Sequence, residues 1–241
     1  MSIKMVLFDL DGTLLPMDQD VFIKTYMGML AKHLMPLGYD PKAFFGAMWA
    51  GTGAMIQNDG TKTNEEAFWD VFCQAIGKNA LTDTPHFERF YIEKFDQVQS
   101  FCGYTPHAAQ ALRFIKKQGL RTALATNPLF PRIATEKRIA WAGLSPDDFE
   151  LYTTYETEHY CKPNLNYYRS VAERLGVRPE ECLMVGNDVS DDMVAEELGM
   201  QVFLLTDCLI NQNNVDISRY PQGSFDNLMA YIDGLNQGNT I

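Results

Sequence analysis

The sequence predicts an α/β protein with a doubly wound parallel sheet and an inserted α-helical cap. Two observations predict the sheet: a short apolar run near the N-terminus, and further short apolar runs that alternate with helical patterns from about residue 105 onward. Strands separated by helices imply right-handed crossovers, and therefore a parallel sheet with helices on both faces. A third observation predicts the cap: between these two regions, apolar residues recur at helical spacing alone.

The expected elements follow from these patterns. Strands are expected at residues 3–8, 120–126, 150–155, 182–186 and 201–206. Helices of the core are expected at residues 106–117, 131–142, 166–176 and 191–199. We expect the last residues, 236–241, to form a loose tail.

The segment 17–103 is expected to form about four helices, because turn signals such as Asp40-Pro41 interrupt its helical pattern. With 241 residues, the chain is long enough for a core and a smaller second domain. We expect a core formed by 1–16 and 104–241 and a cap formed by 17–103. An insertion directly after the first strand would lie over the carboxyl ends of the strands, where open α/β sheets bind ligands.

Composition narrows the class of partner. The chain has 31 acidic residues and 20 Lys and Arg, a formal net charge of −11, which disfavours nucleic acids and anionic membranes as partners. Its five cysteines are spread out without a CxxC pair, as is typical of reduced thiols in the cytoplasm. No apolar run approaches the roughly 20 residues of a membrane span. We therefore expect a cytoplasmic protein whose main partner is neither a nucleic acid nor a membrane.

The strongest chemical signal is Asp9-Leu10-Asp11-Gly12-Thr13, directly after the first strand. Two carboxylates separated by one residue can point into one crevice, and Gly12 allows a sharp turn there. Their mutual repulsion would be relieved by a divalent cation, and hard oxygen ligands favour Mg²⁺. Taken alone, this run could equally be an Asp-rich turn that only caps the next element.

Polar residues also follow the later strands. Thr126-Asn127 ends one strand, Asn187 and Asp188 follow another, and Lys162 lies between them in the sequence. In one crevice these residues would supply acidic metal ligands, a hydroxyl and amide groups for phosphoryl oxygens, and one cation. Phosphoryl transfer needs this set, because its catalysis is mostly positioning and charge stabilisation.

In their order, the segments FDLDGT, ATN, KPN and VGNDVSDDM resemble the four motifs of the haloacid dehalogenase-like superfamily. The resemblance covers the core, about 150 residues, and it implies a Rossmann-like sheet with a helical cap after the first strand, as in phosphoglycolate phosphatase-like members.

The resemblance also implies residue roles. Asp9 would be the nucleophile that forms an aspartyl-phosphate, and Asp11 the general acid and then the general base. Thr126, Asn127 and Lys162 would bind the phosphoryl group, with Lys162 also neutralising charge on the nucleophile.

Mg²⁺ would lie between the Asp9 carboxylate, the Asp11 backbone carbonyl and an acid of the last motif. In the family this acid commonly follows the glycine directly, whereas here Asn187 follows Gly186 and Asp188 comes next. Either Asn187 binds the metal through its amide oxygen, or the backbone shifts and Asp188 reaches it. We favour Asp188 as the metal ligand, with Asp192 paired to it four residues later, because a negatively charged ligand stabilises a bound dication.

The resulting expectation is a Mg²⁺-dependent phosphatase of a small phosphorylated metabolite, with the cap excluding bulk water during transfer. A phosphomutase of the same family would use the same residues but return the phosphoryl group to the substrate. A haloacid dehalogenase would need neither Mg²⁺ nor Asp11. A binding or regulatory protein could keep the fold without turnover, although packing alone does not require this set of polar residues.

Overall fold

The computed structural model describes residues 2–77 and 80–237. Its sheet has five parallel strands in the order β2-β1-β3-β4-β5. The strands are β1 Met5–Phe8, β2 Arg121–Leu124, β3 Cys182–Gly186, β4 Gln201–Leu205 and β5 Gln222–Gly223. The chain leaves β1 toward β2 on one side and reaches β3 on the other, so the strand order reverses at β1. Open α/β sheets bind ligands at such a reversal.

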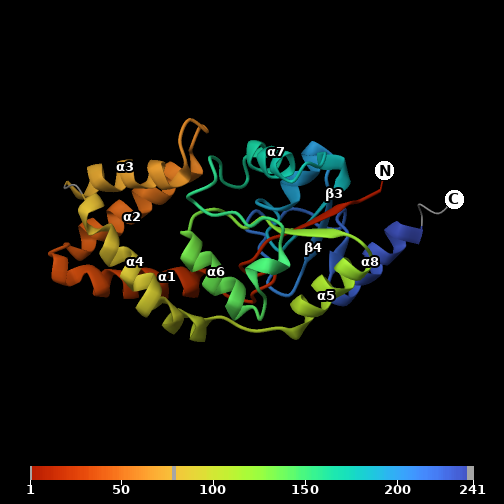
Figure 1. Cartoon of the computed structure of the whole chain (residues 1–241), viewed down its shortest axis with the longest axis horizontal. Coiled ribbons are helices and arrows are strands. Elements are labelled where there is room, and N and C mark those ends of the chain that lie inside the picture. Colours follow the sequence, from red (N-terminus) through yellow and green to blue (C-terminus); the bar gives the residue numbers. More distant parts are fainter. Residues whose placement is uncertain (1, 78–79, 238–241) are drawn as a thin grey trace.

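Side chains alternate between two apolar layers on the two faces of the sheet. In β1, Val6 and Phe8 pack into one layer, and Met5 and Leu7 pack into the other. Helices α5 (Pro106–Lys117) and α8 (Phe225–Gln237) lie together on the first face, and α7 (Leu165–Arg174) and the 3-10 helix η6 (Met193–Leu198) lie on the second (Figure 1). The predicted doubly wound α/β fold is therefore confirmed.

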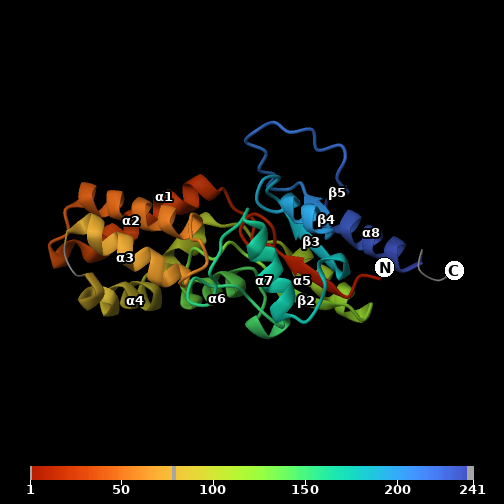
Figure 2. The ribbon, with the colours of Figure 1, turned by 90° about the horizontal axis from the view of Figure 1, so that it is seen from above.

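The segment between β1 and β2 is helical. Helices α1 (Gln19–Leu34), α2 (Pro41–Ile56), α3 (Asn64–Ile76) and α4 (Thr84–Glu93) gather at one end of the molecule, and the sheet lies at the other in both views (Figures 1 and 2). The 3-10 helices η1 (Met35–Leu37), η2 (Ala80–Asp83) and η3 (Phe95–Phe101) connect them. The number of helices agrees with the sequence prediction; the domain boundaries remain a prediction.

Polar caps explain where three of these helices begin. The Asp18, Asp40 and Thr63 side chains accept hydrogen bonds from the backbone N–H groups at the starts of α1, α2 and α3. In α3, Glu66 completes a reciprocal capping box with Thr63. The local sequence therefore fixes the helix starts.

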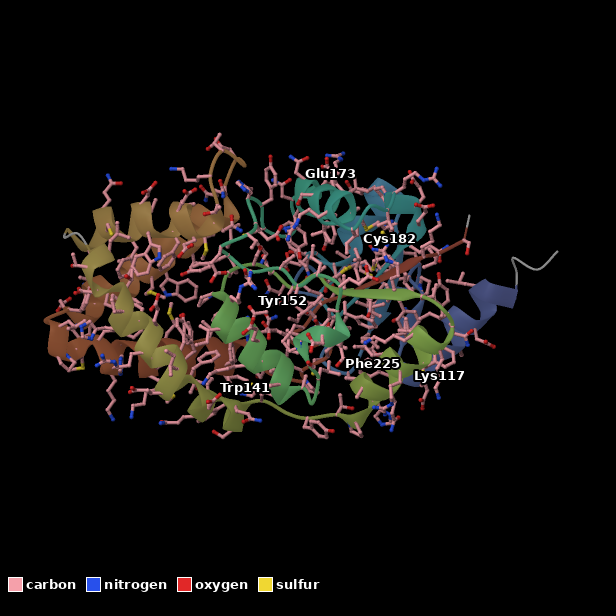
Figure 3. The ribbon with its side chains drawn as sticks, viewed as in Figure 1. Lys117, Trp141, Tyr152, Glu173, Cys182 and Phe225 are labelled. Atoms are coloured by element: carbon pink, nitrogen blue, oxygen red, sulfur yellow. The ribbon has the colours of Figure 1, made fainter. Side chains whose placement is uncertain are left out.

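Helix α6 (Arg132–Trp141) lies between the helical end and the sheet (Figure 1), and the short 3-10 helices η4 (Pro146–Asp148) and η5 (Pro179–Glu181) complete the fold. Trp141, at the end of α6 (Figure 3), packs against Phe95 of η3 with ring centroids 4.9 Å apart. No helix in the described ranges is long and apolar enough to cross a membrane.

The structure corrects two predicted elements. Residues 150–155 do not form a strand: Tyr152 makes one isolated bridge to Leu124. Beyond this bridge the Thr126 carbonyl accepts from the Thr153 hydroxyl at 2.6 Å, the Tyr155 N–H bonds the Phe130 carbonyl at 3.1 Å, and the chain turns at 155–157. The predicted helix at 191–199 is the shorter 3-10 helix η6.

At the C-terminus, β5 and α8 were not predicted from the sequence. The expected loose tail is wrong for 236–237, which end α8, and residues 238–241 lie outside the described residues.

Candidate active site

A buried lysine joins two carboxylates at the carboxyl edge of the sheet. Asp9 follows β1 directly, and its backbone N–H bonds Val185 of β3 at 2.9 Å. Lys162 Nζ lies 2.9 Å from Asp9 Oδ1 and 2.6 Å from Asp192 Oδ1. The lysine is only 2% exposed. Residues far apart in the sequence therefore meet at the point where the strand order reverses.

Electrostatics keep this lysine charged. Burial alone lowers the pKa of Lys162, but the carboxylates of Asp192 and Asp9 outweigh burial and raise the pKa well above its usual value. Lys162 therefore presents a permanent positive charge beside the Asp9 carboxylate. A lone surface lysine would have neither the burial nor the two partners.

Asp11 is paired with a residue that the sequence analysis did not single out. The Arg138 guanidinium forms a salt bridge with Asp11 Oδ2, and Arg138 is fully buried on α6. The other oxygen, Asp11 Oδ1, is buried without a hydrogen-bond partner among the described residues. Burial raises the pKa of Asp11, the nearby Arg138 lowers it, and the nearby Asp9 raises it, with a net upward shift.

Arg138 could have been found from the helical pattern. It occupies the buried stripe of α6 together with Ala134 and Trp141. A charged side chain at an apolar position of a helix requires a buried partner of opposite charge. Phe130 covers the guanidinium, whose carbon lies 4.2 Å from the ring centroid.

The Asn187 amide is held in a fixed orientation between Cys208 and Thr13. Its Nδ2 donates to the Cys208 carbonyl at 2.7 Å, so its Oδ1 points toward Thr13, whose hydroxyl lies 2.9 Å away. The same hydroxyl lies 3.1 Å from Asp9 Oδ2. Gly12 makes this approach possible: its φ is +84°, and a Cβ there would lie 2.4 Å from Asn187 Nδ2.

Asp188 and Asp192 are engaged differently. Asp188 Oδ1 accepts hydrogen bonds from the backbone N–H groups of Ser190 at 2.7 Å and Asp191 at 3.0 Å. Asp192 Oδ2 accepts from the Asp188 N–H at 3.0 Å, while Asp192 Oδ1 binds Lys162. Gly186 is required here, because a Cβ would lie 2.1 Å from Asp192 Oδ2. The choice of Asp188 over Asn187 as a metal ligand stays a prediction.

Thr126 and Asn127 follow β2 and reach the same crevice. Asn127 Nδ2 donates to Asp191 Oδ2 at 3.2 Å, and Asn127 Oδ1 accepts from the Lys162 backbone N–H at 3.3 Å. Thr126 is 2% exposed, and its carbonyl accepts from Tyr167 at 2.8 Å. All the residues predicted for the site line one cavity of about 110 Å³: Asp9, Asp11, Thr126, Asn127, Lys162, Asn187, Asp188 and Asp192.

The donor set fits a hard divalent cation. Five carboxylates line the crevice, and two cations, Lys162 and Arg138, pair with them. In the described part of the chain no three His, Cys, Asp or Glu side chains form a metal cluster. A metal there would therefore bind neutral oxygens as well, and Asn187 Oδ1 is a side-chain oxygen of this kind that lines the crevice.

The matches to known proteins cover the residues of the site described above. A family model described as haloacid dehalogenase-like hydrolase matches residues 3–199. A phosphoglycolate phosphatase of Pseudomonas putida is 24% identical over 96% of this chain and 79% of its own. Acyl-CoA dehydrogenase family member 10 of Mus musculus is 25% identical over 83% of this chain, which spans only 17% of that protein.

Solved structures show the same fold. A HAD phosphatase from Thermococcus onnurineus superposes with a TM-score of 0.60 at 21% identity, over 96% of this chain and 99% of its own. A predicted phosphoglycolate phosphatase from Haemophilus somnus gives a TM-score of 0.57 at 19% identity, over 96% and 98%. The family match over most of the chain, joined to this architecture, shows that the chain belongs to the haloacid dehalogenase-like hydrolases.

Proposed function

We propose that this chain is a Mg²⁺-dependent phosphatase that hydrolyses a small phosphomonoester through an aspartyl-phosphate on Asp9. The observation that carries the proposal is the buried Lys162 ammonium held between Asp9 and Asp192. An attacking carboxylate and an incoming phosphate are both negative, so a fixed cation beside the carboxylate lowers the barrier to their approach. The phosphatase names of several relatives support the same reaction class.

In the first step, an Asp9 oxygen forms a bond to phosphorus, and the bond between phosphorus and the alcohol oxygen breaks. Lys162 and the Thr126 hydroxyl, with the backbone N–H of Asn127, would hold the phosphoryl oxygens. The Thr13 hydroxyl lies within hydrogen-bond distance of both Asp9 Oδ2 and Asn187 Oδ1, and its single proton can be donated to one of them at a time. In the second step, water attacks phosphorus, the Asp9 ester bond breaks, and phosphate leaves.

Asp11 is proposed to move the protons in both steps. It would donate a proton to the leaving alcohol oxygen and then accept one from the attacking water. Its raised pKa, caused first by burial, supports a carboxyl group that can hold this proton. The Arg138 guanidinium binds Asp11 Oδ2, whereas Oδ1 has no hydrogen-bond partner among the described residues and would be the oxygen that exchanges the proton.

Mg²⁺ would be held by the Asp9 carboxylate, the Asp11 backbone carbonyl and either Asn187 or Asp188. Bound there, the cation would offset the surplus negative charge of the crevice and of the phosphate. The fixed position of Asn187 Oδ1 in the crevice, beside Thr13, supports the amide. Charge supports Asp188, whose Oδ1 already accepts two backbone hydrogen bonds.

The proposal is tested by trapping the intermediate. Protein incubated with Mg²⁺ and p-nitrophenyl phosphate is quenched in acid and digested, and the peptide that holds Asp9 is expected to carry one phosphoryl group. The Asp9→Asn variant is expected to lose turnover by at least about 10³-fold and to give no labelled peptide. The exposed Asp20→Asn is the matched control. Label on another residue, or full turnover by Asp9→Asn, would refute the proposal.

A second experiment separates the two metal ligands. Mg²⁺ affinity is measured by calorimetry for Asn187→Ala and for Asp188→Asn, which removes charge but keeps shape. The ligand is the residue whose substitution weakens binding at least about tenfold. Unchanged affinity in Asp188→Asn would refute the preference stated from the sequence.

A further inference from the structure

A second, larger cavity lies beside the catalytic crevice. Its volume is about 470 Å³, within the range of small-molecule pockets. Helices α1 to α4 form one wall, and residues of 129–136 with 155–156 form the other. Ile23, Leu129 and Phe130 line both this cavity and the catalytic crevice. An ester whose phosphate lies beside Asp9 would therefore extend its alcohol into this space.

The walls of the cavity are mainly aromatic and apolar. Trp69 and Phe87 are buried and stand edge to face, with ring centroids 5.1 Å apart. Trp49 is 58% exposed and also lines the cavity. The remaining large apolar side chains of the lining include Tyr26, Met48, Met55, Phe68 and Tyr91. Such walls favour a flat or ring-bearing ligand, because rings stack with rings and bury a large area.

The charge of the cavity is negative. Its lining includes Glu65, Glu88, Glu136 and Glu156, and Arg132 is the single cation among the described lining residues. The Arg132 guanidinium donates to the Tyr152 hydroxyl at 3.1 Å, over the Tyr152 ring. Tyr152 does not line the cavity. The guanidinium is thus engaged by Tyr152, and the described lining residues include four carboxylates against this one cation.

One carboxylate oxygen of the cavity lacks a partner. Glu156 Oε1 accepts from the Arg132 backbone N–H at 2.8 Å. Glu156 Oε2 is buried without a hydrogen-bond partner among the described residues. Leaving such an acceptor unpaired is costly. A ligand that donates a hydrogen bond, above all a charged one, would remove this cost.

The neighbouring Glu65 shows the same excess of negative charge. Burial raises the pKa of Glu65, and the nearby Glu156 raises it further. A positive charge placed between the two carboxyl groups would be stabilised by both, and the aromatic faces around them also attract cations. A carboxylate in the same place would be repelled.

We propose that this cavity binds the alcohol half of the substrate, and that this alcohol is an apolar, ring-bearing group with an ammonium or N–H donor directed at Glu156. The inference rests on the proposed phosphatase function and adds the substrate class. It separates this chain from its phosphoglycolate phosphatase relatives, since phosphoglycolate has a small alcohol half that carries a carboxylate.

Three aryl phosphates of similar size test the charge preference. They carry, opposite the phosphate, an aminoethyl group (tyramine O-phosphate), an ethyl group, or a carboxymethyl group. We expect kcat/KM for the amine to exceed that for the carboxylate by at least about tenfold, with the ethyl compound between them, and phosphoglycolate to be poorer still. Equal values, or a preference for the carboxylate, would overturn the inference.

The variant Glu156→Gln tests whether Glu156 causes the preference for the amine. It is expected to reduce the ratio of kcat/KM between the amine and the ethyl ester to within about threefold. Glu173→Gln removes the same charge from the exposed surface of α7, over the part of the molecule that holds the sheet (Figure 3), and should keep the wild-type ratio. A ratio unaffected by Glu156→Gln would overturn the role of Glu156.

Binding measured without turnover separates a failure of the proposed phosphatase function from a failure of the proposed substrate class. Calorimetry of the same three esters with Asp9→Asn should give the same order of affinity. If the wild-type protein turns over none of them and no phosphoaspartate forms, the proposed function fails, while the order of affinities still decides the inference. If turnover occurs without this order in either measurement, only the inference fails.

Discussion

The two adjoining cavities differ in size and in the charge and polarity of their linings. The crevice at the sheet edge is small and crowded with charge: Lys162 is buried between Asp9 and Asp192, and Arg138 is buried against Asp11. The cavity beneath the helices is about four times larger and mostly aromatic, with carboxylates but little free positive charge. The crevice suits a group common to many substrates, whereas the larger cavity suits the part that differs among them.

This difference shows how the fold separates chemistry from selectivity. Asp9, Thr126 and Asn187 stand just after the ends of β1, β2 and β3, where the hydrogen bonds of the sheet fix their positions, and Lys162 reaches them from the loop before α7. Residues of the larger cavity come mainly from helices that the chain inserts after β1. Helix packing tolerates changes of apolar side chains better than buried ion pairs tolerate the loss of a partner. Substitutions in the two regions should therefore have different effects.

The largest effect is expected for Lys162→Met. Asp9 and Asp192 would be left buried without their cation, so turnover of p-nitrophenyl phosphate should fall by about 10³-fold. The free energy of unfolding should fall by about 3 kcal/mol, as for other buried ion pairs that lose one partner. Turnover is measured with p-nitrophenyl phosphate, and the free energy of unfolding is measured by urea unfolding.

A surface ion pair provides the control for this variant. Lys137 pairs with Asp96, whose side chain is 58% exposed, so Lys137→Met should change the free energy of unfolding by less than about 1 kcal/mol. Turnover should be kept. An equal loss of stability in the two variants would contradict the view that burial makes the Lys162 pair special.

The sequence was sufficient to predict the residues of the crevice that follow strands, whereas Lys162, in the loop before α7, was predicted through the resemblance of KPN to a family motif. Asp9, Thr126 and Asn187 each come at the end of an apolar run, and parallel strands bring such ends to one edge. β5, two residues long, has too little pattern to be recognised. Residues 150–155 look like a strand, but tertiary hydrogen bonds of Thr153 to the Thr126 carbonyl and of the Tyr155 N–H to Phe130 replace further strand pairing.

The sequence did not predict which residues of the helices contact residues of distant loops. Arg138 lies 127 positions after its partner Asp11, and no local pattern links them. The cavity under the helices was also not predicted, since spacing identifies which residues face inward but not where helices leave space between them. The orientation of Asn187 likewise depends on Cys208, in a segment whose structure the sequence left open.

A smaller loss of turnover is expected for Gly186→Ala. The added Cβ would lie 2.1 Å from Asp192 Oδ2, so the carboxylate must move away from Lys162 and turnover should fall by about 10²-fold. Gly28→Ala, at an exposed position in α1 with no atom near the added Cβ, should keep turnover and gain up to about 1 kcal/mol of stability. Normal turnover in Gly186→Ala would show that the position of Asp192 is not critical.

The next effect, about tenfold on kcat, is expected for Arg138→Met, and its signature is a pH profile. The guanidinium lowers the pKa of Asp11, so its removal should raise that pKa further. The limb of the kcat/KM profile that reports Asp11 should therefore move to higher pH. Arg138→Lys keeps the charge and should move it less. An unmoved limb in Arg138→Met would mean that Arg138 only packs α6 against its neighbours.

The smallest effect is expected for Trp49→Ala in the larger cavity. Trp49 is half-exposed, so its loss should remove about 1 kcal/mol of apolar contact with the alcohol half of the ester and raise KM about fivefold. Turnover at saturation should not change, because the residue is remote from Asp9. Phe101→Ala is the control: Phe101 is 48% exposed and does not line the cavity, so KM for tyramine O-phosphate should stay the same. If both variants raise KM equally, the effect comes from general loosening of the helices, and the larger cavity does not select the substrate.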